Sequence, residues 1–218
     1  MPAASAATTD RTLFQRYAER AVAGTAVYTV DPAASKVRLY AFRGGKAARM
    51  GHNHVFDAPR FEGYLSLPGD DPTQAQFELA FRLDELTVDA PALRAETGGN
   101  FSGERSESDI AGTLRNLLSA RVMDAANHPL VTLRSVRIEG DWPLLVARVQ
   151  ITMHGTAREQ DILLQVERKA GALRASGEFV LRQSDYGIVP LSILGGLVAV
   201  QDPVAVRFDL TAEPLSPQ

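Results

Sequence analysis

His52 and His54, separated by one residue, are the side chains in this sequence whose types and spacing best suit chemistry. In an extended segment, side chains at positions i and i+2 project from the same face about 6 to 7 Å apart. Two imidazoles so placed could share a Zn, Cu or Ni ion, which nitrogen ligands suit better than Ca or Mg. Because the chain has no cysteine, a third ligand would have to come from His128, His154, Asp57 or another carboxylate. The alternative, which we favour, is that both histidines form hydrogen bonds with the backbone of a loop.

Two further polar groups are candidates for recognising the head of a ligand. The first is a basic cluster made of Arg43, Lys46 and Arg49. It could meet a phosphate or a carboxylate, although such charges are more often those of a solvated loop. The second follows a strand-like segment and contains Arg182, Asp185 and Tyr186. For this group we favour an Arg–Asp pair and a packed tyrosine at the end of the fold.

The sequence does not contain the motifs of the common enzyme classes. It has no Gly-x-Ser-x-Gly elbow, no phosphate-binding loop and no dinucleotide fingerprint after a strand. No nucleophile and base pair is evident, and a cysteine nucleophile is excluded. We therefore expect no hydrolase or oxidoreductase turnover in the metal-free protein, and no required cofactor.

Composition and charge restrict the class of partner. The 218 residues carry 23 Lys and Arg against 26 Asp and Glu, a net charge of −3, so the chain as a whole has no attraction to nucleic acid or anionic lipid. The longest apolar run, residues 193–200, is short and is interrupted by Gly195 and Gly196, so no integral membrane segment is expected. The N-terminal residues lack the features of a signal peptide. This favours a cytoplasmic protein as the sequence stands, or a periplasmic one if the chain is a trimmed mature form.

Alternating apolar and polar residues predict that most of the chain forms half-buried strands. In residues 74–83, Ala75, Phe77, Leu79, Phe81 and Leu83 share one face. About eight such segments joined by turns indicate an all-β antiparallel sheet that closes as a barrel or packs as a sandwich. We predict one inserted helix from Ser108 to Ala120, after a mobile loop at 98–107, and an N-terminal helix capped by Thr9 or Asp10 and ending near Ala23. Residues 1–24 would be an extension, and residues 25–213 the barrel domain.

The apolar strand faces also predict a lumen that binds a ligand. Small residues alternate with large ones on these faces, which leaves open a cavity or an interdigitated core. We predict a continuous apolar lumen whose ligand-binding residues are Phe77, Leu79, Phe81, Val149, Ile151, Phe179, Val206 and Phe208.

Several motifs, weak individually, together resemble the YceI-like family in their order and spacing. They are Val30 to Val37, Phe61-Glu62-Gly63, Asn127-His128-Pro129, Ile151 to Thr156, Leu181 to Ile188 and the final strand at 204–212. The resemblance implies a lipocalin-like barrel that holds an isoprenoid, a fatty-acid derivative or a similar amphiphile, with no known chemistry. It also implies export to the periplasm and a homodimer, as is usual among relatives. The sequence Gly51-His52-Asn53-His54 departs from the common form and suggests a variant whose ligand or metal use differs.

Overall fold

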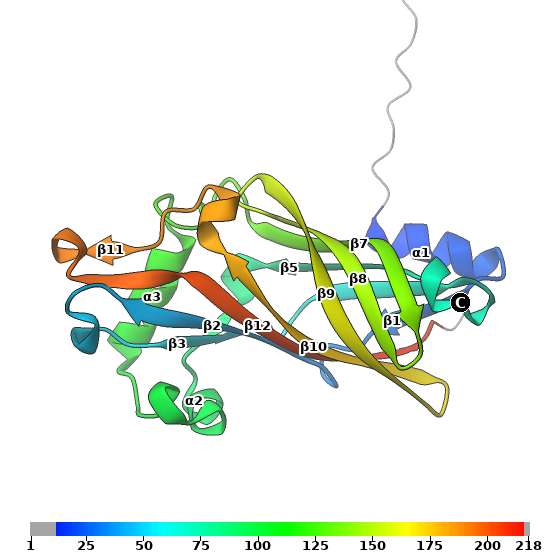
Figure 1. Cartoon of the computed structure of the whole chain (residues 1–218), viewed down its shortest axis with the longest axis horizontal. Helices are drawn as coiled ribbons and strands as arrows, with labels where there is room; N and C mark the ends of the chain where they lie inside the picture. The colour runs from blue at the N-terminus through cyan, green and yellow to red at the C-terminus, as the bar shows by residue number, and fades with distance from the viewer. Residues whose placement is uncertain (1–11, 216–218) are drawn as a thin grey trace, which may run out of the picture.

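A closed antiparallel barrel forms the body of the computed structural model, which describes residues 12–215 (Figure 1). Its strands are β1 Ala26–Val30, β2 Lys36–Gly44, β3 His54–Asp57, β4 Glu62–Leu67, β5 Gln76–Arg82, β6 Thr87–Val88, β7 Leu130–Asp141, β8 Leu144–Met153, β9 Thr156–Lys169, β10 Ala172–Arg182, β11 Ser192–Ile193 and β12 Val198–Pro214. Within the described residues, eight strands close in the order β1-β4-β5-β7-β8-β9-β10-β12, and Val30 of β1 pairs with Ala212 of β12 to complete the ring. The predicted all-β, lipocalin-like barrel of about eight strands is confirmed.

The ring forms because each strand has one apolar face to bury. In β8 the inward residues Leu145, Ala147, Val149 and Ile151 are at most 4% exposed, whereas the residues between them face outward. Register is therefore fixed, since a slip of one residue would turn this whole face to water. Gly177 of β10 lets the backbone of β9 approach closely and does not enlarge the lumen, because a Cβ at this position would lie 2.6 Å from the Leu163 carbonyl oxygen.

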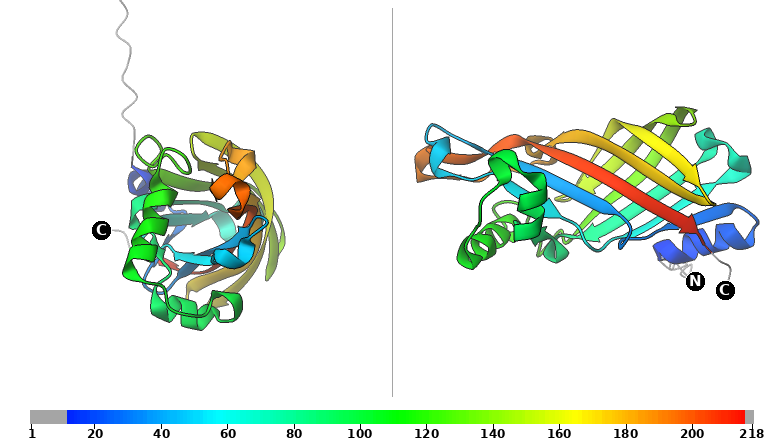
Figure 2. Two further views of the ribbon diagram at one scale, coloured as in Figure 1. Left: turned by 90° about the vertical axis from the view of Figure 1, so that its left-hand side faces the viewer. Right: turned by 90° about the horizontal axis from the view of Figure 1, so that it is seen from below.

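The other four described strands, β2, β3, β6 and β11, extend the sheet at one end of the barrel, where β11 pairs with β12. The long strand β12 pairs along one edge with β10 and along the other first with β2 and then with β1. From β2 the sheet continues through β3 to β6. Helix α3, Glu107–Leu118, lies beside the opening of the ring at this end (Figure 2, left). Its Ile110, Leu114 and Leu117 pack against the cluster of Ala41, Phe56 and Val88.

The N-terminal helix α1, Leu13–Val22, packs on the outside of the opposite end of the barrel (Figure 2, right). Tyr17 is fully buried and stacks on Tyr64, with ring centroids 5.4 Å apart. The helix is capped by Thr12, which forms a capping box with Gln15. The predicted caps Thr9 and Asp10 lie outside the described residues, and Thr12 replaces them because its side chain reaches the third helical residue.

The predictions of a helix from Ser108 to Ala120 and of a mobile loop at 98–107 need correction. Helix α3 is capped by Ser106, not by Ser108, and a second helix, α2 Pro91–Thr97, was not predicted. The segment predicted as a mobile loop is anchored, because the guanidinium of Arg94 donates to the carbonyls of Ser102 and Gly103. Within residues 12–215, no helix has the length and apolar character needed to cross a membrane.

Candidate functional site

The interior of the barrel contains a cavity of about 610 Å³. Its volume lies within the range of small-molecule sites, roughly 300 to 1,000 Å³. The structure places all the predicted lumen residues on its wall: Phe77, Leu79, Phe81, Val149, Ile151, Phe179, Val206 and Phe208. They come from β5, β8, β10 and β12, so the wall is formed by strands from both halves of the ring.

The exposure of the aromatic residues shows that the interior is a void and not a filled core. Phe77, Phe81, Phe179 and Phe208 line the cavity, yet each is only half-buried. A side chain inside a barrel keeps accessible surface only where no neighbouring side chain fills the space beside it. The lumen therefore has unfilled apolar surface that a ligand could cover.

The apolar part of the cavity extends to the β7–β8 hairpin, where Trp142 lies. Its sequence context, Gly-Asp-Trp-Pro, predicts an exposed or edge aromatic residue; in the structure Trp142 lies in this hairpin, is half-buried and lines the cavity. The guanidinium carbon of Arg168 lies 5.3 Å from the centre of its ring. The ring therefore lies between a cation and the lumen.

The other end of the cavity, near α3, contains the polar side chains of the wall, among them His54, which is held by a carboxylate. Nδ1 of His54 lies 2.6 Å from Oδ2 of Asp89. Nη1 of Arg94 donates to Oδ1 of Asp89 over 2.7 Å, and the backbone N–H of Val55 donates to the same oxygen over 3.0 Å. Asp89 and Arg94 are almost fully buried, whereas His54 lines the cavity. Asp89 and Arg94 form a buried ion pair, and the carboxylate of Asp89 holds the imidazole of His54 at the cavity wall.

The charge of Asp89 determines which ring nitrogen of His54 is available to a ligand. Burial alone would raise the pKa of Asp89, but hydrogen bonds from His54, Val55 and Arg94 outweigh it and lower the pKa below the ordinary value. An ionised carboxylate only accepts hydrogen bonds, so Nδ1 of His54 is the donor. Nε2 is then the ring nitrogen that remains to meet a ligand.

His52 also lines the cavity, beside His54. Partial burial and the nearby charge of Arg105 lower its pKa, so the neutral imidazole is favoured. Between the two histidines, Asn53 is buried and accepts the backbone N–H of Arg43 over 3.0 Å. The loop is therefore ordered by its own hydrogen bonds.

The structure does not bring a third metal ligand to these histidines. Among residues 12–215, no group of three or more His, Asp or Glu residues could hold a metal ion. Asp57 lies three positions after His54 in β3, on the opposite face of the strand. His128 and His154 lie together at the β8–β9 turn, with ring centroids 5.6 Å apart, and His154 contacts the Tyr186 carbonyl oxygen. Metal binding by His52 and His54 stays an untested prediction without geometric support.

The remaining predicted head-group residues lie outside the cavity. Arg182 pairs with Asp202 over 3.6 Å and not with Asp185, because Asp202 in β12 lies beside it across the sheet. Tyr186 is buried and is likewise absent from the cavity wall. The neighbouring Gln183 does line the wall, and its amide donates to the Gln201 carbonyl oxygen.

Sequence reasoning missed Asp89 and Arg94. Both look like ordinary surface residues in the sequence, and Asp89 is 35 positions from His54. The one local signal was the strand-like end at Val88 followed by Ala90-Pro91, a favourable helix start that would place Arg94 within the first turns.

Comparison with known proteins supports the same architecture. The model of the family described as YceI-like domain matches residues 28–212. BcnA of Burkholderia cenocepacia has a similar structure, with a TM-score of 0.62 and 14% identity over 84% of this chain and 98% of that one. The YceI protein of Campylobacter jejuni gives a TM-score of 0.52 and 10% identity over 74% of this chain and 84% of that one. No curated protein sequence matches this chain. At such identities the solved structures show a common fold and no more.

Proposed function

The chain belongs to the YceI-like domain family, and from its cavity we propose that it binds, and so carries or sequesters, a long apolar or amphiphilic molecule such as an isoprenoid or fatty-acid derivative. The proposal includes no chemical conversion of that molecule. It rests on one observation above the others: the aromatic residues that point into the barrel remain half-exposed to a cavity of about 610 Å³.

The size and surface of the cavity are sufficient for a long chain. A methylene group occupies about as much space as a water molecule, roughly 30 Å³, so there is room for on the order of twenty carbons. Burying each methylene contributes about 0.8 kcal/mol, so a chain of a dozen carbons gains about 10 kcal/mol before ordering costs. For the roughly twenty carbons that the cavity could hold, the gain would be about 16 kcal/mol, which at a micromolar Kd leaves about 8 kcal/mol for the ordering costs.

The polar end of the cavity suggests how an amphiphile would be oriented. His52 and His54 from the β3 region and Asp109 and Asn116 from α3 line the wall near the opening. A pocket that is apolar along its length still needs a few placed polar groups to orient its ligand. We infer that a hydroxyl or comparable polar head lies here, with the chain extending toward Trp142.

A fluorescence titration tests the proposal, because Trp142 is the one tryptophan of the chain and lines the cavity. The protein is first extracted with organic solvent, and native mass spectrometry checks that no ligand remains. Farnesol or palmitate should then change Trp142 emission saturably at one molecule per chain, while glycerol should not. The proposal would be contradicted if Trp142 emission did not saturate, or if mass spectra showed no complex of the protein with farnesol or with palmitate.

A further inference from the structure

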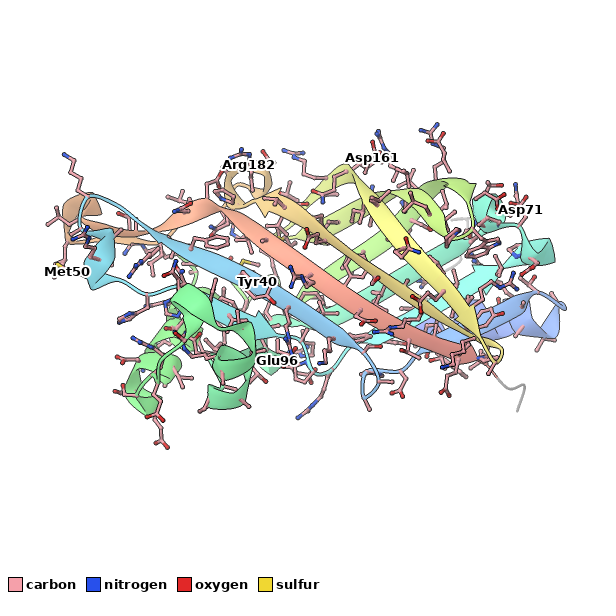
Figure 3. The ribbon with its side chains drawn as sticks, turned by 60° about the horizontal axis from the view of Figure 1, so that its bottom comes forward. Tyr40, Met50, Asp71, Glu96, Asp161 and Arg182 are labelled. Carbon is pink, nitrogen blue, oxygen red and sulfur yellow. The ribbon has the colours of Figure 1, made fainter. Side chains whose placement is uncertain are left out.

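Two loops beyond the polar opening of the cavity form one protruding unit, here called the loop tip and consisting of residues 45–50 and 193–197. They contain the short helices η1 Ala48–Met50 and η7 Leu194–Gly196. The backbone N–H of Ala47 donates to the Leu197 carbonyl oxygen over 2.7 Å. Gly45 lies so close that a Cβ there would be 2.5 Å from the same oxygen. The loop tip lies at the end of the molecule opposite α1, and Met50 marks it in Figure 3.

The loop tip exposes large apolar side chains. Met50 is 70% exposed and Leu194 is 63% exposed, while Ile193 and Leu197 are about half-exposed. Leu194 also has a φ of +52°, a left-handed conformation that glycine and asparagine adopt at lower cost. A turn that only had to connect two strands would gain from asparagine here. Leucine therefore has a cost to the fold that packing within the protein does not offset.

The same surface is positively charged within an acidic protein. Segments 43–51 and 187–201 contain Arg43, Lys46 and Arg49 but no Asp or Glu, although the whole chain carries a net charge of −3. Within the part of the chain that the structure describes, neither Lys46 nor Arg49 forms an ion pair. Arg121 adds a further cation, since its Nη2 donates to the Ser192 carbonyl oxygen over 2.6 Å.

Two acidic residues that flank this surface, Asp202 and Asp109, have other partners. Asp202, just after the second segment, accepts from Ser184 and pairs with Arg182. Asp109 lies at the start of α3 and acts electrostatically on His52. Neither is within the loop tip, so its cations remain available to an external anion.

The loop tip is continuous with the opening of the cavity, because its residues Met50 and Ile193 also line the cavity. We propose that the loop tip docks on the surface of a lipid bilayer that contains anionic lipid. Met50 and Leu194 enter the interface between headgroups and chains, while Lys46 and Arg49 contact the anionic headgroups. The cavity then opens toward the membrane. Docking does not require a ligand in the barrel, so it goes beyond the proposed function and can be tested apart from it.

Charge complementarity favours a membrane over a second copy of the chain. In a symmetric dimer through this surface, Lys46 and Arg49 of one chain would face the same cations of the other, with no acid in segments 43–51 and 187–201 to pair with them. An anionic bilayer supplies the missing negative charge and also accepts the apolar side chains.

Co-sedimentation with vesicles tests this proposal, with phosphatidylcholine vesicles compared with vesicles that also contain phosphatidylglycerol. The wild-type protein should bind the second kind, and less so as salt is raised. Lys46→Gln with Arg49→Gln should weaken binding by about tenfold or more. Leu194→Asn should weaken vesicle binding severalfold. It should not lower Tm, because asparagine tolerates the left-handed backbone at this position. Unfolding would then not explain the loss of binding.

Matched controls remove similar groups elsewhere. Arg60→Gln with Lys169→Gln removes two exposed cations away from the loop tip, and Val22→Gln removes an apolar side chain that is 85% exposed on α1. These variants should bind vesicles like the wild type, and the loop tip variants should keep the Trp142 response to farnesol. No binding to phosphatidylglycerol vesicles, or equal losses in the controls, overturns the proposal. The proposal is also overturned if sedimentation velocity shows a wild-type dimer that becomes monomeric in the loop tip variants while their binding to vesicles is unchanged.

Discussion

Blocking the lumen at Val149 gives the sharpest test of ligand binding in the barrel. Val149 is 1% exposed and its side chain lines the cavity near the middle of β8. Replacing its isopropyl group with the indolylmethyl group of tryptophan, Val149→Trp, adds about seven heavy atoms and should displace about four methylene groups of the ligand. At about 0.8 kcal/mol for each methylene, the loss is about 3 kcal/mol, or roughly 100-fold in Kd.

The matched control is Val146→Trp, the same substitution three residues earlier in the same strand. Val146 faces outward and is 37% exposed, opposite Leu163 of β9. The control should therefore leave affinity unchanged. Binding is measured as displacement of a fluorescent fatty acid, which avoids the added tryptophan, and Tm is recorded for both variants because overpacking can cost about 1 to 3 kcal/mol of stability. Equal affinity in folded Val149→Trp and wild-type protein would refute binding in the lumen.

Three predictions concern the fold that holds the site. Arg94→Met should lower the free energy of unfolding by about 3 to 5 kcal/mol in urea titrations, because it leaves the buried Asp89 carboxylate without its guanidinium; a loss below 1 kcal/mol would contradict this. Hydrogen bonds lower the pKa of Asp89, so its contribution to stability is present above the unfolded pKa of about 4 and is lost as pH falls through the lower folded value. Asp89→Asn should therefore flatten acid unfolding followed by circular dichroism, and an unchanged pH profile would count against it. Gly177→Ala should cost about 1 to 3 kcal/mol in thermal denaturation, since the added Cβ would lie 2.7 Å from Phe208 Cζ; unchanged stability would show that the strands shift freely.

The sequence predicted the barrel well because its strands have one apolar and one polar face. In residues 74–83 the alternation is plain, and strand β5, Gln76–Arg82, lies within them. The same rule placed the predicted lumen residues on the cavity wall, since the apolar face of a closed sheet must point inward. Alternation cannot distinguish a filled interior from an open one, because that depends on barrel size and on rotamers.

The polar end was much harder to predict. Asp89 and Arg94 are buried because they satisfy each other and the backbone, and such pairing has no periodic signal. The sequence drew attention to His52 and His54 as a pair sharing a metal. In the structure His54 instead has a carboxylate partner far along the chain. Only the pairing of β3 with β6 brings the end of β6 beside His54.

The buried ion pair has a cost that stability alone does not explain. Removing a carboxylate and a guanidinium from water is expensive, and apolar residues of similar volume are often as stable in such a position. A barrel that only had to enclose a hydrocarbon chain would gain little from Asp89 and Arg94. Their contacts instead fix the tautomer and orientation of His54 at the cavity wall and anchor the segment that leads to α3. The pair therefore holds His54 at the opening of the cavity, which is where the proposed function places the polar head of the ligand.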